Sequence, residues 1–292
     1  MGDNIAGPRC PICGNDRWHD RAMPECTHCG LAVGSLEFDA AAMRHAVAAS
    51  FAGGGEDGFA LSPHARRNAG WALGYVEAEG GWQRAAPVAA DVTLGIIARA
   101  ADSDAVSAML DGLCSHFVHA IVLLDGTPRD AAALALRHPG IDAVSHPLNG
   151  DFAAQRNRVQ MMASGWVLQL DTDERPDAAL LSAMGWMTAA ADRAGLQSLG
   201  LARRNLVDGI WSALWPDIQY RLNRAEVRFT GIVHERPVVP FAQTSLALTG
   251  AIEHRLDRAR VVERSKVYAA MSAGAGRPED EAALLRPMTA AE

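Results

Sequence analysis

The chain has 292 residues, of which about half are hydrophobic and about a fifth are charged, the balance of an ordinary globular protein. This length allows a large core and more than one structural unit. The formal net charge of -7 disfavours a general nucleic-acid surface.

No apolar run approaches the roughly 18 to 20 residues that span a bilayer. The first residues, "MGDNIAGPRCPICGND", also lack the basic and apolar segments of a signal peptide. We therefore expect a cytoplasmic protein with no transmembrane segment and no nucleic-acid partner.

Residues 1–35 form a cysteine-rich head in which the motifs "CPICG" and "CTHCG" make a C-x2-C-x12-C-x2-C array. Four thiolates in two such knuckles match tetrahedral Zn²⁺, and closed four-cysteine sites are normally structural. Iron of the rubredoxin type would use the same ligands, and His19 and His28 are reserve ligands. The spacing predicts a zinc ribbon that staples the chain or binds a partner, with these ligands: Cys10, Cys13, Cys26 and Cys29.

Residues 36–90 are rich in Ala and Gly and predict a helical connector. Helical patterns cover residues 38–50 and 63–79, and the breaker "GGGEDG" separates them.

Strand and helix patterns alternate from residue 91 onward. Such alternation predicts an α/β domain with a mainly parallel sheet flanked by helices, over residues 91–270. Residues 271–292 predict a loosely ordered tail with a short helix near 279–285. The expected strands are 92–98, 118–124, 141–146 and 166–170, and the expected helices are 103–114, 128–138, 151–164 and 176–195.

Two acidic residues fall at the carboxyl ends of predicted strands, Asp125 and Asp171. Ligands of parallel α/β sheets bind beyond this edge, so we expect both side chains on one ligand-binding rim. Asp171 and Asp173 together suit Mg²⁺ or Mn²⁺, which prefer oxygen ligands and bridge to substrate phosphates. Glu174 and Asp177 are interpreted as acids at a helix start.

Basic residues cluster at Arg203 and Arg204 and across 255–264. They predict a solvated surface.

Several segments carry a family resemblance. They are "VTLGIIA", "AIVLLDGTPRD", "GDFAAQRNRVQMMASGWVLQLDTDE", "PDIQYRLNRAEVRFTGIVHE" and "IEHRLDRARVVERSKVYAAM". In this order they resemble the family 2 glycosyltransferases of GT-A fold, in the branch of lipopolysaccharide-core glucosyltransferases and peptide S-glycosyltransferases. The resemblance spans residues 91–270, and its last segment looks like the family's helical close. It implies a metal-dependent, inverting hexosyltransferase that uses a nucleotide-sugar, with UDP as the expected nucleotide.

The resemblance also assigns roles on the donor side. Asp125, Arg156 and Asn157 would contact the base or ribose of the nucleotide. Asp171 would lie near the ribose or sugar and Asp173 would be the main ligand of Mn²⁺ or Mg²⁺.

On the acceptor side, His234 would face the diphosphate as a metal ligand or hydrogen-bond donor. Glu235 is the first choice for the base that deprotonates the acceptor and Asp217 is the second. The acceptor would be a glycan, a lipid-linked glycan or a peptide.

Two other functions remain open. The segment after the first strand, "ARAADSD", departs from the family's Asn-Glu pattern, and "DGTPRD" is shorter than its usual loop. A non-catalytic nucleotide- or partner-binding protein, in which the zinc ribbon does the binding, is the main alternative. A nucleotidyltransferase ranks lower because "ARAADSD" has no glycine-rich phosphate loop.

Overall fold

The computed structural model describes residues 4–53, 61–232, 234–271 and 278–288. Most of the predicted breaker and parts of the tail lie outside these ranges. The cysteine-rich head forms a small three-stranded antiparallel sheet, order β1-β2-β3. Its strands are β1 (Asn4–Ala6), β2 (Arg17–His19) and β3 (Glu25–Cys26).

The connector contains two helices and one hairpin: α1 (Ala40–Ala52), α2 (Pro63–Ala72), β4 (Tyr75–Ala78) and β5 (Gly81–Arg84). Each helix starts at a side-chain cap, Asp39 for α1 and Ser62 for α2. The prediction of helix through residue 79 is wrong. Gly74, at φ 75°, turns the chain out of α2, and the hairpin that follows begins with two good strand formers, Tyr75 and Val76.

Nine of the described strands form one large sheet, as the α/β prediction requires. Its path is β10-β16-β11-β13-β9-β6-β7-β8, with β12 paired to β11. The pairs β6–β7, β7–β8, β6–β9 and β11–β16 are parallel, and β13 runs antiparallel to both of its neighbours. The strands are β6 (Val92–Arg99), β7 (His119–Asp125), β8 (Asp142–Ser145), β9 (Trp166–Asp171), β10 (Glu174–Pro176), β11 (Ser198–Val207), β12 (Ile210–Trp211), β13 (Asp217–Arg224) and β16 (Thr244–Leu256).

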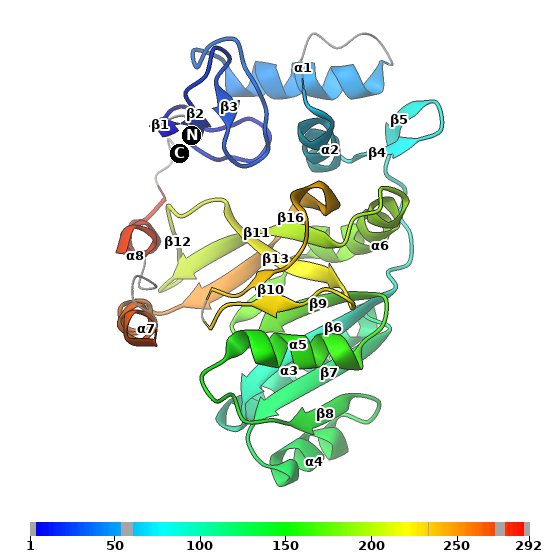
Figure 1. Ribbon diagram of the computed structural model, residues 1–292, viewed down its shortest axis with the longest axis vertical. Coiled ribbons are helices and arrows are strands. Elements are labelled where there is room, and N and C mark those ends of the chain that lie inside the picture. Colours follow the sequence, from blue (N-terminus) through cyan, green and yellow to red (C-terminus); the bar gives the residue numbers. More distant parts are fainter. Residues whose placement is uncertain (1–3, 54–60, 233, 272–277, 289–292) are drawn as a thin grey trace.

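Helices cover both faces of this sheet (Figure 1). They are α3 (Ser103–Leu113), α4 (Pro128–Arg137), α5 (Phe152–Met162) and α6 (Ala178–Arg193), close to the predicted ranges. Short 3-10 turns, η1 (Ala100–Asp102) and η2 (Cys114–His116), flank α3. Asp177 caps α6 as predicted, with its carboxylate accepting the Leu180 N–H at 2.8 Å.

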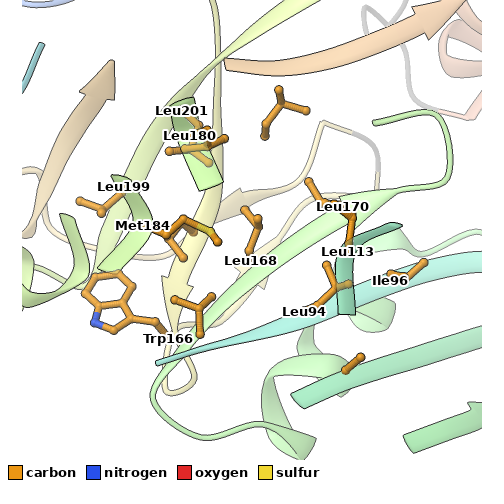
Figure 2. Packing of buried hydrophobic residues seen from close by; sticks show 14 of the residues in the cluster. Leu94, Ile96, Leu113, Trp166, Leu168, Leu170, Leu180, Met184, Leu199 and Leu201 are labelled. Atoms are coloured by element: carbon orange, nitrogen blue, oxygen red, sulfur yellow. The ribbon is translucent and has the colours of Figure 1, made fainter. Parts of the chain in front are cut away.

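The core alternates between the two faces along each strand. Leu94, Ile96 and Leu168 pack with residues of α3 and α6 in the main cluster (Figure 2). Their neighbours Ile121 and Val167 pack instead with α5 in a second cluster. The central strands are buried on both faces, which explains their continuous apolar runs.

The C-terminal part carries a small hairpin, a 3-10 turn and two helices: β14 (Phe229–Thr230), β15 (Arg236–Pro237), η3 (Phe241–Gln243), α7 (Arg258–Met271) and α8 (Pro278–Leu285). The expected helical close at 252–271 is corrected, because residues 252–256 are the last part of β16. The helix predicted near 279–285 is confirmed as α8. No helix of the described ranges combines the length and the apolar character that crossing a membrane requires.

The order of the strands reverses at β6: the chain passes from β6 to β7 and β8 on one side, and then returns to β9 on the other side. In register, Arg99 of β6 lies opposite Asp125 of β7, and Ile97 lies opposite Asp171 of β9. The two acids therefore flank the carboxyl end of β6, two strands or about 10 Å apart. The two acids thus lie on one rim, as predicted, and this rim is the switch point at which open α/β sheets bind ligands.

Candidate functional site

The four cysteines of the head come together as predicted. Their sulfur atoms all lie within 4.8 Å of one another and all four residues are buried. The Sγ atoms of Cys10 and Cys29, and those of Cys13 and Cys26, are 3.5 Å apart. Tetrahedral Zn²⁺ with Zn–S bonds of about 2.3 Å places sulfurs about 3.8 Å apart, so this donor set fits zinc. Neither His19 nor His28 belongs to the group.

A cavity of about 500 Å³ opens at the carboxyl end of β9, beside Arg203 of β11. The antiparallel strand β13 contributes its first residues, and the 229–244 segment, α7 and α8 close the remaining sides. The predicted residues that line it are Arg156, Asp171, Asp217, His234 and Glu235.

Three arginines and two acids form an ion-pair network at the floor of the cavity; Arg156, Arg203, Arg221 and Asp171 line the cavity, whereas Glu174 does not. Asp171 accepts from Arg221 Nη2 at 2.6 Å and from Arg156 Nη2 at 3.1 Å. Glu174, which is fully buried, accepts from Arg203 Nη1 at 2.9 Å and from Arg221 Nη2 at 3.0 Å. Burial alone would raise the pKa of Asp171, but Arg221 and then Arg156 outweigh it, so the pKa is lowered. Asp171 is therefore ionised, and both carboxylates are paired with arginines.

Asp217 is surrounded by donors at the start of β13. Arg203 donates to it at 2.9 and 2.7 Å, Asn205 at 3.0 Å and Gln219 at 2.6 Å. Burial raises the pKa of Asp217, but the charge of Arg203 and the hydrogen bonds outweigh burial and lower the pKa to about 2. Such a carboxylate is a weak proton acceptor at neutral pH.

Glu235, the first choice for the base, is also paired. Its carboxylate accepts from Arg156 Nε and lies 3.8 Å from Arg221 Nη1. Burial raises the pKa of Glu235, but Arg156 and Arg221 outweigh it, so the pKa is lowered. Glu235 becomes a stronger base only if another anion takes over these two arginines.

Asp173 points away from the floor, toward His254 and α7. Asn205 donates a hydrogen bond from Nδ2 to Asp217, so its Oδ1 is the acceptor that faces His254. His254 Nδ1 lies 2.7 Å from this Oδ1 and therefore carries the proton. His254 Nε2 lies 3.6 Å from Asp173 Oδ2. Burial, and then Arg203, lower the pKa of His254 and outweigh the hydrogen bond to Asp173, which raises it. Arg260 supplies the positive charge, 3.0 Å from Asp173 Oδ2.

The carboxylate of Asp173 is a ligand type that suits Mg²⁺ or Mn²⁺, whereas an imidazole nitrogen suits Zn²⁺ and the later transition metals. The described residues hold no second group of three His, Cys, Asp or Glu side chains as close as the cysteines. Asp171, Asp173 and His234 thus do not converge on one point.

The other predicted residues lie around the cavity or outside it. His234 adopts a left-handed φ of 52°, uncommon for a residue with a side chain, and its ring meets Tyr268 edge-on at 5.2 Å. Asp125 accepts the Leu148 N–H at 3.1 Å and is not part of the cavity lining. Asn157 exchanges two hydrogen bonds with the Phe229 backbone, at 3.0 and 2.6 Å, and so holds β14 against α5.

Sequence reasoning missed three members of the floor. Glu174 is not a helix-start acid but the buried partner of two arginines, because it begins β10 and points under the rim. Arg203 is not solvated, because β11 places it in an ion pair with Glu174. Arg221 stands on β13. The signal was available in "ARRN" and "YRLN", where a charge interrupts an apolar strand.

Comparisons with known proteins add little. No protein-family model matches the chain, and no curated protein matches it. Among solved structures, one match is the crystal structure of a mycobacterial protein, at 13% identity and a TM-score of 0.39. The match covers 63% of this chain and 74% of that one.

Proposed function

We propose that the chain is a metal-dependent glycosyltransferase of GT-A type that moves a sugar from a nucleotide-sugar to an acceptor. UDP is the expected nucleotide, and inversion at the sugar is the stereochemistry that the family resemblance implies. The observation that carries the proposal is Asp171. It stands at the switch point of the sheet and opens into a cavity floored by Arg156, Arg203 and Arg221.

The floor offers what a sugar diphosphate needs. Arg156 and Arg221 already hold carboxylates, and a diphosphate that enters can compete for the same guanidinium groups. The Nε of Arg221 is buried and has no hydrogen-bond partner among the described residues. A buried donor left unpaired costs about 1–3 kcal/mol, so the described residues do not satisfy Arg221 in full.

Asp173 and His254 are the residues that would hold the metal ion. Neither residue lines the cavity, so the diphosphate would extend past Asp171 to reach the ion, which would neutralise the charge that develops on the leaving group. Arg260 now occupies the carboxylate of Asp173, so it must turn away when a cation binds there. Its side chain is half exposed, which leaves it free to do so.

Glu235 remains the proposed base. Its two arginine partners are the groups that a diphosphate would attract, so donor binding would free the carboxylate and restore its basicity. Asp217 is the weaker candidate because Arg203 and Asn205, which donate to it, are also held by Glu174 and His254.

A screen of nucleotide-sugars for release of the nucleoside diphosphate tests the proposal. We expect one donor to be hydrolysed with Mn²⁺ or Mg²⁺, and the release to stop with EDTA and in Asp173→Ala. Asp142→Ala is the matched control, because Asp142 is an exposed acid on β8, at the far edge of the sheet. No hydrolysis of any donor and no binding of UDP would reject the proposal.

The second candidate is a non-catalytic binding protein built on the same pocket. The observation that favours it is the pairing of Glu235 and Asp217 with arginines, which lowers the pKa of both carboxyl groups. Binding of UDP with Mn²⁺ but no turnover of any donor in the presence of acceptor extracts would favour this function.

A further inference from the structure

Figure 1 shows the cysteine-rich head beside α1, above the large sheet. The head is not a separate module, because its side chains pack against the α/β domain. Its buried residues share one hydrophobic cluster with α1, α2 and Leu246 of β16. Ile218 and Tyr220 of β13 pack against the same cluster, and both residues also line the cavity. The head therefore packs behind the Ile218 and Tyr220 side of the cavity.

The first knuckle touches the loop that enters β13. A Cβ placed on Gly14, which follows Cys13, would lie 2.6 Å from Nε1 of Trp215. Arg9 joins the same two segments, since its Nη1 donates to the Gly14 carbonyl at 2.9 Å and to the Trp215 carbonyl at 3.4 Å. Trp215 lies two residues before Asp217, so this contact positions the first residue of β13 and its carboxylate.

The second knuckle reaches β16 through one buried side chain. Asn68 of α2, which is fully buried, donates its Nδ2 to the Cys29 carbonyl at 3.2 Å. Its Oδ1 accepts from the Ser245 hydroxyl at 2.8 Å and from the Leu246 N–H at 2.9 Å. Asn68 thus ties the knuckle to the beginning of the strand that later carries His254.

We propose that the metal held by the four cysteines positions the cavity. The ion joins the two knuckles, and each knuckle holds one of the two strands that flank β11, β13 through Trp215 and β16 through Asn68. Without the ion, a head this small cannot keep its knuckles together, because metal binding supplies much of its folding free energy. Trp215 and Asn68 are positioning residues in this arrangement, whichever ligand the cavity takes.

Hydrogen exchange of the full-length protein, with its metal and after chelation, tests the inference. We expect backbone amides in 214–221 and 244–248 to exchange about tenfold faster or more after chelation. Amides of β6 and β7, on the other side of β9, should keep their protection. Faster exchange confined to residues 4–36 would overturn the inference, and so would uniform loss of protection across the whole sheet.

Two variants that leave the cysteines intact test the Trp215 contact and the Asn68 contact separately. Trp215→Ala should speed exchange in 214–221 alone and Asn68→Ala in 244–248 alone, with metal content unchanged in both. Gly34→Ala is the control within the head, because a Cβ there meets no atom within 4 Å. If neither variant changes exchange outside the head, the inference is wrong. A protein that binds no nucleotide can still pass this test, so its outcome is independent of the proposed function.

Discussion

The acids of the candidate site are paired with arginines, and Glu174 is the most deeply buried of them. Its carboxylate is fully buried and depends on Arg203 and Arg221. Charged partners in such a position are costly to separate, since the remaining ion cannot be hydrated.

Arg221→Met should therefore lower the free energy of unfolding by about 3–5 kcal/mol. Arg224→Met is the control on the same strand, because Arg224 pairs with an exposed Asp192 and should contribute about 0–1 kcal/mol. Urea denaturation of the three proteins measures both. Equal stability of the two variants would contradict the assignment of Arg221 to a buried pair.

Asp217 gives a prediction with a definite pH range. Its folded pKa, about 2, is below the ordinary value of 3.8, so the unfolded chain binds the proton more readily. The stabilisation, about 2 kcal/mol, is complete above the ordinary value and is lost as the pH falls toward 2. NMR titration of the Asp217 carboxyl carbon checks the pKa. An NMR titration midpoint near pH 4 would contradict the pairing. In urea denaturation at pH 7, Asp217→Asn should be less stable than the parent by a similar amount.

At the scale of elements, the head is the part whose chemistry the sequence determines most fully. Two knuckles with fixed spacing leave tetrahedral metal as the common solution, and the structure brings the four sulfurs together.

Freshly purified protein should contain about one zinc per chain, and Cys10→Ser/Cys13→Ser should contain none. Elemental analysis measures zinc and iron together, so it also decides between the zinc and rubredoxin-type alternatives. Ser35→Ala, in the head but outside the cluster, should keep its metal. Parent protein with no metal would contradict the prediction.

Most elements from residue 92 to 195 were predictable because β6, β7 and β9 are apolar on both faces and α4, α5 and α6 begin at side-chain caps. The rest of the sheet was not, since β11 and β13 carry Arg203, Asn205, Arg221 and Asn223, which interrupt the apolar pattern. Those side chains are buried only because partners from distant segments meet them. The charges within "ARRN" and "YRLN" indicate buried polar side chains, but the sequence does not show which distant partner each of them meets.

At the scale of the whole molecule, topology places the site. Reversal of the connections at β6 brings Asp125 and Asp171 to one rim, and this was predictable from alternation alone. The direction in which Asp173 points was not predictable. It depends on β16, whose His254 faces Asp173, and on Arg260 of α7.

The central claim is that this rim binds a nucleoside diphosphate together with a divalent cation. Calorimetric titration of the protein with UDP, with and without Mn²⁺, tests it most directly. The account predicts binding that requires Mn²⁺ and is lost in Asp173→Ala, whereas Asp142→Ala binds like the parent. Absence of UDP binding to the metal-loaded parent, or unchanged UDP–Mn²⁺ binding in Asp173→Ala, would contradict it.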